Sequence, residues 1–111
     1  MTIRQGDIFL ADLNPVKGHE QAGYRPVLIM QNDILNRNLN TAIIAPITSN
    51  LQAKGKLTTY FLSKKDSKLG KDSVVLLFQI RTLDIRRLQK KVVCIKKENF
   101  LEIKRQLKFI F

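Results

Sequence analysis

Two short stretches of the sequence combine residue types that could act on a phosphate group. The first, GHEQAGYRPVLI at residues 18–29, is polar and glycine-containing, and ends in Arg25 and Pro26 before an apolar run. The second, PITSN at residues 46–50, places Thr48 and Ser49 at the end of another apolar run. The planar fork of a guanidinium matches two phosphate oxygens, and a hydroxyl can hold a phosphate by hydrogen bonds. Such a pair could stabilise the charge on a phosphate that is being cleaved.

The composition excludes several other kinds of active site. His19 is the only histidine and Cys94 the only cysteine, so a pair of imidazoles or a cysteine–histidine metal cluster cannot form within one chain. The carboxylates are scattered singly, without a set spaced to hold two magnesium ions, and no phosphate-binding glycine motif is present. We therefore expect no cofactor and no metal. If this chain cuts a nucleic acid, RNA is the expected substrate, because its 2′-hydroxyl can act as an internal nucleophile.

The charge of the chain is strongly unbalanced. Lys and Arg number 20 against 9 Asp and Glu, which gives a net charge of +11 and a pI near 10.2. Residues 81–111 alone hold ten basic and three acidic residues, a net charge of +7. Such an excess favours a polyanionic partner, with nucleic acid as the first choice and an anionic membrane as the second. A basic surface that serves only solubility is the alternative.

Several features predict a soluble cytoplasmic protein without a membrane partner. A single cysteine cannot form an intrachain disulfide, and Asp7 lies where a signal peptide would enter its apolar core. The longest apolar run, residues 74–78, is far too short to cross a bilayer. Cys94 lies in the apolar segment VVCI, which predicts that it is buried as a small hydrophobic residue.

The pattern of apolar residues predicts a mainly β protein. Short β-branched segments bounded by turn residues indicate strands at residues 6–13, 26–31, 41–47, 57–63 and 92–95. Residues 73–83 read as one long curved strand, and residues 32–40 could hold one helical turn. Apolar residues then recur at helical spacing and predict a C-terminal helix: Phe100, Ile103, Leu107 and Ile110. We expect one domain, residues 1–111, that folds as a small antiparallel barrel with short helices and a C-terminal helix.

The two chemical stretches also have ordinary structural interpretations. Arg25 could be a surface arginine paired with Glu20, and Thr48 could be a turn residue that caps its own backbone. The functional interpretation requires that the strands carrying them be neighbours, so that both side chains open on one cleft.

At this point the sequence resembles a known family. GDIFLADLNPVKGHEQAGYRPVLIMQND, APITSN and KDSVVLLFQIRTLD together resemble the MazF/PemK toxin endoribonucleases, from about residue 6 to residue 88. The resemblance implies an SH3-like barrel of the kind shared with CcdB, assembled as a homodimer. It implies metal-independent cleavage of single-stranded RNA, including mRNA, to 2′,3′-cyclic phosphate and 5′-hydroxyl ends. A cognate antitoxin with an acidic, flexible tail is the implied protein partner.

The same resemblance implies roles for individual residues. Arg25 matches the catalytic arginine and Thr48 the catalytic threonine of the family, and Ser49 follows in the same motif. Glu20 and Gln21 match a pair that would position Arg25 or the RNA. Three polar positions would read the bases: Asn32, Ser73 and Gln79. Alternatively, Glu20 is an ordinary solvated carboxylate and Gln79 simply faces outward from a strand.

This chain departs from the family pattern in places. Tyr24 precedes Arg25, where it could stack on a base or pack on the loop. The segment SKLGKDS, residues 67–73, differs in residue order, so its contacts with RNA do not transfer directly. Two other functions compete with RNA cleavage: a CcdB-like toxin that binds gyrase without nuclease activity, and a non-catalytic RNA-binding module. The intact EQ, RP and PITS elements argue against the gyrase-binding mode.

Overall fold

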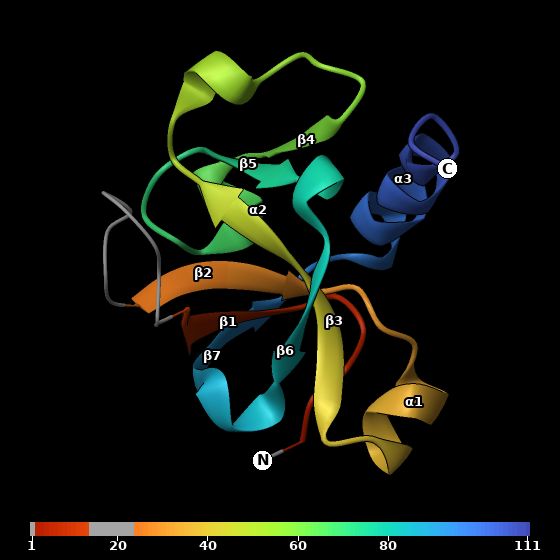
Figure 1. Cartoon of the computed structure of the whole chain (residues 1–111). Helices are drawn as coiled ribbons and strands as arrows, with labels where there is room; N and C mark the ends of the chain where they lie inside the picture. Colours follow the sequence, from red (N-terminus) through yellow and green to blue (C-terminus); the bar gives the residue numbers. More distant parts are fainter. Residues whose placement is uncertain (1, 14–23) are drawn as a thin grey trace.

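The computed structural model describes residues 2–13 and 24–111, and Figure 1 shows the course of the chain. Within these residues seven strands form a strongly curved antiparallel sheet in the order β4–β5–β3–β2–β1–β7, and β6 also pairs with β3. The strands are β1 (Asp7–Asp12), β2 (Tyr24–Ile29), β3 (Thr41–Thr48), β4 (Thr59–Leu62), β5 (Ser73–Leu76), β6 (Arg81–Asp84) and β7 (Leu88–Cys94). The helices are α1 (Asp33–Asn38), α2 (Lys64–Ser67) and α3 (Lys97–Leu107), and the 3-10 turns are η1 (Leu51–Ala53), η2 (Leu77–Gln79) and η3 (Ile85–Arg87).

The central strand β3 changes partner along its length, and this gives the sheet its curvature. Its first half pairs with β6 from Thr41 to Ile44, and its end pairs with β5 at Ile47 and Thr48. Pro46 lies between the two pairings and has no N–H to donate, which is tolerated where one ladder stops and another begins. The expected mainly β fold with short helices and a C-terminal helix is confirmed.

The long strand predicted for residues 73–83 is wrong in one respect, because the structure breaks it at η2. Val75 pairs with Ile47, whereas Arg81 pairs with Ile44. Val75 and Arg81 are six positions apart, but their partners in β3 are only three positions apart. The three surplus residues form the 3-10 turn. The apolar run gave no local sign of this break, since Leu77 is buried whether the backbone is a strand or a turn.

Two apolar clusters cover opposite faces of the β1–β2–β3 sheet, as alternate strand residues require. The first cluster contains Ile8, Leu28 and Ile47 and is closed by Phe100 and Ile103 of α3. The second contains Phe9, Val27 and Ile44 and is closed on the β6–β7 side by Leu83 and Leu88. Burial on both faces holds these three strands rigid, and their ends therefore make a firm support for loops.

Helix α3 begins at Lys97 and buries Phe100 and Ile103, which confirms the helical period read from the sequence. Helix α1 also fits the expected single turn and is capped by the Asn32 side chain. The prediction that Cys94 is buried is wrong, because its side chain is exposed. Desolvation and the nearby Asp7 carboxylate raise the pKa of the Cys94 thiol. Among the described residues, no helix is long and apolar enough to cross a membrane.

Candidate active site

Arg25 and Thr48 lie at the same edge of the sheet. Strands β2 and β3 are antiparallel neighbours, with Val27 opposite Pro46 and Ile29 opposite Ile44. The pairing ends at Val27 and Pro46, so Arg25 and Thr48 each lie two residues beyond this last pair, at adjacent strand ends. The pairing of β2 with β3 therefore confirms that the strands that carry Arg25 and Thr48 are neighbours.

The two side chains also share a face of the sheet. Alternate residues of a strand point to the same side of the sheet. The side chain of Arg25 therefore points to the side of Val27, and that of Thr48 to the side of Ile44. Val27 and Ile44 both belong to the second apolar cluster. Arg25 and Thr48 therefore form the polar end of a row in which Val27 and Ile44 are fully buried. Both are half-buried, which leaves part of each side chain accessible to a substrate.

The Thr48 hydroxyl already has a structural contact. Its Oγ1 accepts a hydrogen bond of 3.1 Å from the backbone N–H of Asn50, and the Asn50 side chain in turn caps η1. The capping role expected as an alternative for Thr48 is therefore present in the structure. It uses an oxygen lone pair, and the hydroxyl hydrogen can still be donated to a phosphate oxygen. Ser49, the next residue, is exposed.

Ser73 has a structural contact and little accessible surface. It is 3% exposed, and its Oγ donates a hydrogen bond of 3.1 Å to the Lys71 carbonyl. A base edge cannot reach this hydroxyl directly. Ser73 instead orders the segment before β5, whose second residue, Val74, is paired with Thr48.

That segment carries a group of lysines that the sequence reading did not single out. Residues 64–71 contain four lysines, all exposed, which we call the lysine loop: Lys64, Lys65, Lys68 and Lys71. Asp72 accepts a hydrogen bond of 2.8 Å from the backbone N–H of Lys64 and closes the base of the loop. The high proportion of lysines in this short segment is the feature of the sequence that could have identified the loop. Only the β3–β5 pairing shows that the loop adjoins the end of the strand that carries Thr48.

Asn32 and Gln79 lie elsewhere. Asn32 follows β2 at the end opposite to Arg25, separated from it by about 20 Å of extended chain. Its side-chain oxygen accepts a hydrogen bond from Leu35 and caps α1. Gln79 is exposed on η2, partway along the sheet, and lies on a turn where the sequence suggested a strand. Phe78 beside it is 53% exposed, an aromatic surface that the sequence reading missed.

Glu20 and Gln21 lie outside the described residues. Their expected role next to Arg25 therefore stays a prediction. Tyr24, at the first position of β2, is 65% exposed and does not pack into a core.

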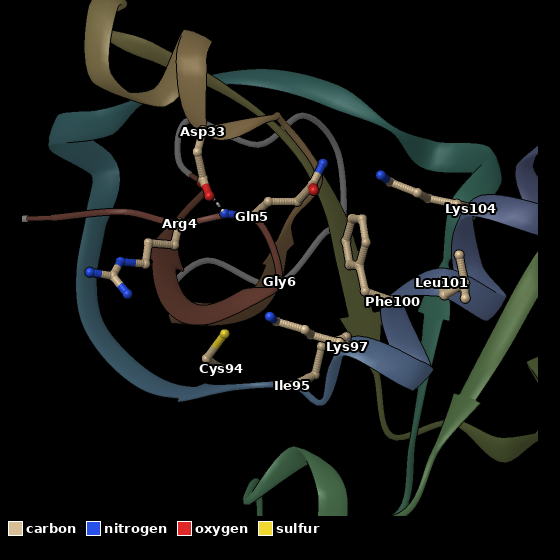
Figure 2. Close-up of a pocket in the computed structure, with 10 residues that line it drawn as sticks. All are labelled: Arg4, Gln5, Gly6, Asp33, Cys94, Ile95, Lys97, Phe100, Leu101 and Lys104. Carbon is tan, nitrogen blue, oxygen red and sulfur yellow. Dashed lines mark hydrogen bonds between the residues drawn. The ribbon is translucent and has the colours of Figure 1, made fainter.

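A pocket of about 490 Å³ lies at another part of the molecule (Figure 2). Figure 2 shows side chains of α3, among them Phe100 and Lys97, facing the N-terminal segment around Gly6. Of the residues that the sequence proposed for catalysis or RNA binding, none within 2–13 and 24–111 lines it. Asp33 at its rim is occupied by a hydrogen bond of 2.8 Å from the Gln5 backbone. The pocket offers three cations to a phosphate, Arg4, Lys97 and Lys104, but the lining that the structure describes contains no hydroxyl side chain beside them. The strand edge, which carries both an arginine and a threonine, is therefore the better candidate site.

Comparison with known proteins supports the same interpretation. The family model described as PemK-like, MazF-like toxin of type II toxin–antitoxin systems matches residues 4–111. The chain is 49% identical over 102 residues to Endoribonuclease MazF of Staphylococcus epidermidis, covering 91% of this chain and 84% of that protein. It is also similar to the crystal structure of MazF from Deinococcus radiodurans, with a TM-score of 0.77 and 27% identity over 99% of this chain and 96% of that one.

A further structure from Deinococcus radiodurans, a MazE–MazF crystal form, matches with a TM-score of 0.79, 27% identity and the same coverage. The family match spans nearly the whole chain, and the curated relative is similar over most of its length. The chain therefore belongs to the PemK-like, MazF-like toxin family of type II toxin–antitoxin systems.

Proposed function

We propose that this toxin is a sequence-specific endoribonuclease that cuts single-stranded RNA without a metal ion. The observation that supports the proposal is the antiparallel pairing of β2 with β3, since Arg25 and Thr48 follow two residues beyond its last pair, Val27 and Pro46. A second support is the 49% identical relative, which is named an endoribonuclease. Inhibition of translation and growth in the cytoplasm would follow from cleavage of mRNA.

The chemistry follows from the two side chains. The RNA 2′-oxygen attacks the adjacent phosphorus, its proton leaves, and the bond to the 5′-oxygen breaks as that oxygen takes up a proton. The products are a 2′,3′-cyclic phosphate and a 5′-hydroxyl. The Arg25 fork binds two equatorial oxygens of the phosphorane, and the Thr48 hydroxyl donates to the same phosphate. The pKa of a free guanidinium is above about 12, which makes charge stabilisation the larger contribution of Arg25.

Substrate binding would extend beyond these two residues. Ser49 lies next to Thr48, and Glu20 and Gln21 would position Arg25 or the RNA. Gln79 and the exposed Phe78 offer an amide and a ring to an unpaired base. Asn32 is too far along β2 to meet the same nucleotide as Arg25, so in our proposal it contacts RNA further along the strand or from a second copy of the chain.

We propose that the lysine loop supplies phosphate contacts beside the cleavage site. Replacing its four lysines with glutamine should weaken RNA binding and flatten its salt dependence by about 0.7 in the log–log slope for each lost contact. Fluorescence anisotropy with single-stranded RNA at several salt concentrations measures this. The matched control removes the same charge elsewhere, at Lys90, Lys97, Lys104 and Lys108. An equal effect of both variants would show that only net charge matters.

We infer two protein partners. Leu35 and Phe111 are exposed apolar residues on the rim of one pocket of about 470 Å³, and such a surface favours a second copy of the chain. Light scattering should give twice the monomer mass of 12.8 kDa, and a stable monomer at micromolar concentration would contradict a homodimer.

The second partner is a cognate antitoxin with an acidic tail, since a 27% identical relative is solved as a MazE–MazF complex and this chain carries a net charge of +11.

The function itself is tested by incubating the purified protein with a mixed pool of single-stranded RNAs in EDTA. We expect cuts at one short sequence, and sequencing the released 5′ ends reads that sequence directly. The new 5′ ends should accept phosphate from a polynucleotide kinase, because they are hydroxyls. Uncut RNA across the whole pool, or cleavage that stops in EDTA, would refute the proposal. Binding without products would indicate the non-catalytic module instead.

A further inference from the structure

The amide of Gln106 joins α3 to the segment between β3 and β4. Its Nε2 donates hydrogen bonds of 3.2 Å to the Lys56 carbonyl and 2.8 Å to the Leu57 carbonyl, and it also donates to the Thr59 carbonyl. These acceptors lie 47 to 50 residues away in the sequence. The two hydrogens of this one amide are therefore shared among three carbonyls of a turn that has little apolar material of its own.

A second contact lies one helical turn earlier on the same face of α3. Glu102 accepts a hydrogen bond of 3.0 Å from the Tyr60 hydroxyl. Partial burial and this bond both raise the pKa of Tyr60, so the hydroxyl keeps its hydrogen at all physiological pH values. Residues four apart on a helix are neighbours. Glu102 and Gln106 thus hold the start of β4 at two points, and α3 itself is anchored in the first core by Phe100 and Ile103.

A series of hydrogen bonds connects these contacts of Gln106 and Glu102 with Thr48. The Thr59 side chain is buried and donates a bond of 2.7 Å to the Ala53 carbonyl at the end of η1. Asn50 caps the other end of η1, accepting from Gln52 N–H at 3.1 Å. The Asn50 N–H then binds the Thr48 Oγ1. Every step between Gln106 and the Thr48 hydroxyl is therefore a backbone turn or a hydrogen bond.

Building on the endoribonuclease function proposed above, we propose that Gln106 is a positioning residue for that reaction. It holds residues 49–58 against α3 and so keeps the Asn50 N–H on the Thr48 hydroxyl, which sets the direction in which this hydroxyl donates. Gln106 does not touch the RNA in this proposal. Its loss should therefore reduce the rate of the chemical step more than the binding of substrate.

The test compares Gln106→Met with the wild type. Methionine keeps the length and helix preference of glutamine and lacks its N–H donors. We expect kcat to fall about tenfold, as a small misplacement of a catalytic group can cause, with KM changed by less than about twofold. Hydrogen exchange should become faster at the amides of Lys54, Lys56 and Thr59, which are all bonded within the held segment. The control Lys108→Met changes an exposed residue of the same helix end and should leave kcat within about twofold.

A double-mutant cycle with Thr48→Ala separates this role from general stability. If Gln106 acts through Thr48, adding Gln106→Met to Thr48→Ala should not slow the residual reaction further. An equal loss of kcat in both backgrounds, or unchanged kcat together with faster exchange, would overturn the proposal. Gln106→Glu keeps the side-chain shape and provides a second test if the methionine variant folds poorly. Wild-type protein that fails to cut RNA would instead refute the endoribonuclease function on which the proposal rests.

Discussion

Replacing Arg25 with alanine should reduce RNA cleavage by about a thousandfold or more, the range found when a cation that stabilises phosphoryl transfer is removed. The physical reason is that, among the residues proposed for the site, Arg25 alone has a planar guanidinium that can bind two phosphate oxygens. Folding should survive, because Arg25 lies at the polar end of its row, outside the fully buried core. Single-turnover cleavage of a labelled RNA and a thermal melt measure the two quantities.

Arg25→Lys provides the informative control, because it keeps the charge and loses the planar fork. If charge stabilisation is the main contribution, lysine should restore part of the rate, and the slope of rate against pH should be unchanged. If Arg25 carries the proton, lysine should move the pH–rate profile, since the pKa of an ammonium is near 10.4. Full activity in Arg25→Ala would remove this residue from the mechanism altogether.

Replacing Thr48 with valine should cost about a hundredfold in kcat, the effect of losing one donor that stabilises developing charge. Valine keeps the shape of threonine but cannot donate to the phosphate, and it leaves the Asn50 N–H without its acceptor. Thr48→Ser keeps both functions of the hydroxyl and should retain most of the rate. Steady-state kinetics on a short RNA, with circular dichroism as a check on folding, makes the comparison.

Ser49→Ala tells whether any hydroxyl at this strand end suffices. Ser49 directly follows the last residue of β3, and successive residues of a strand point to opposite faces, so we expect a loss below about tenfold. A larger loss at Ser49 than at Thr48 would mean that the continued β2–β3 register is wrong at the strand ends. That outcome would also weaken the case for Arg25 facing Thr48.

The sequence alone was sufficient for the mainly β fold, the C-terminal helix and the candidate residues Arg25 and Thr48. Each of these depends on local information: β-branched runs between turn residues, apolar positions at helical spacing, and short motifs shared with a family. The capping role of Thr48 was also foreseeable, because a hydroxyl at a strand end commonly bonds the backbone two residues on.

Other features depended on which distant segments pair. The pairing of β2 with β3 made the strands that carry Arg25 and Thr48 neighbours, and the pairing of β5 with β3 brought the lysine loop to the end of β3. The pairing of β3 with both β5 and β6 broke the predicted strand at η2, and the fold left Ser73 buried. Gln106 showed no motif, since the carbonyls that it binds are about fifty residues away. Register and packing arise from contacts between segments far apart in the chain, so only the tertiary structure decides how the residues that the sequence supplies are combined into a site.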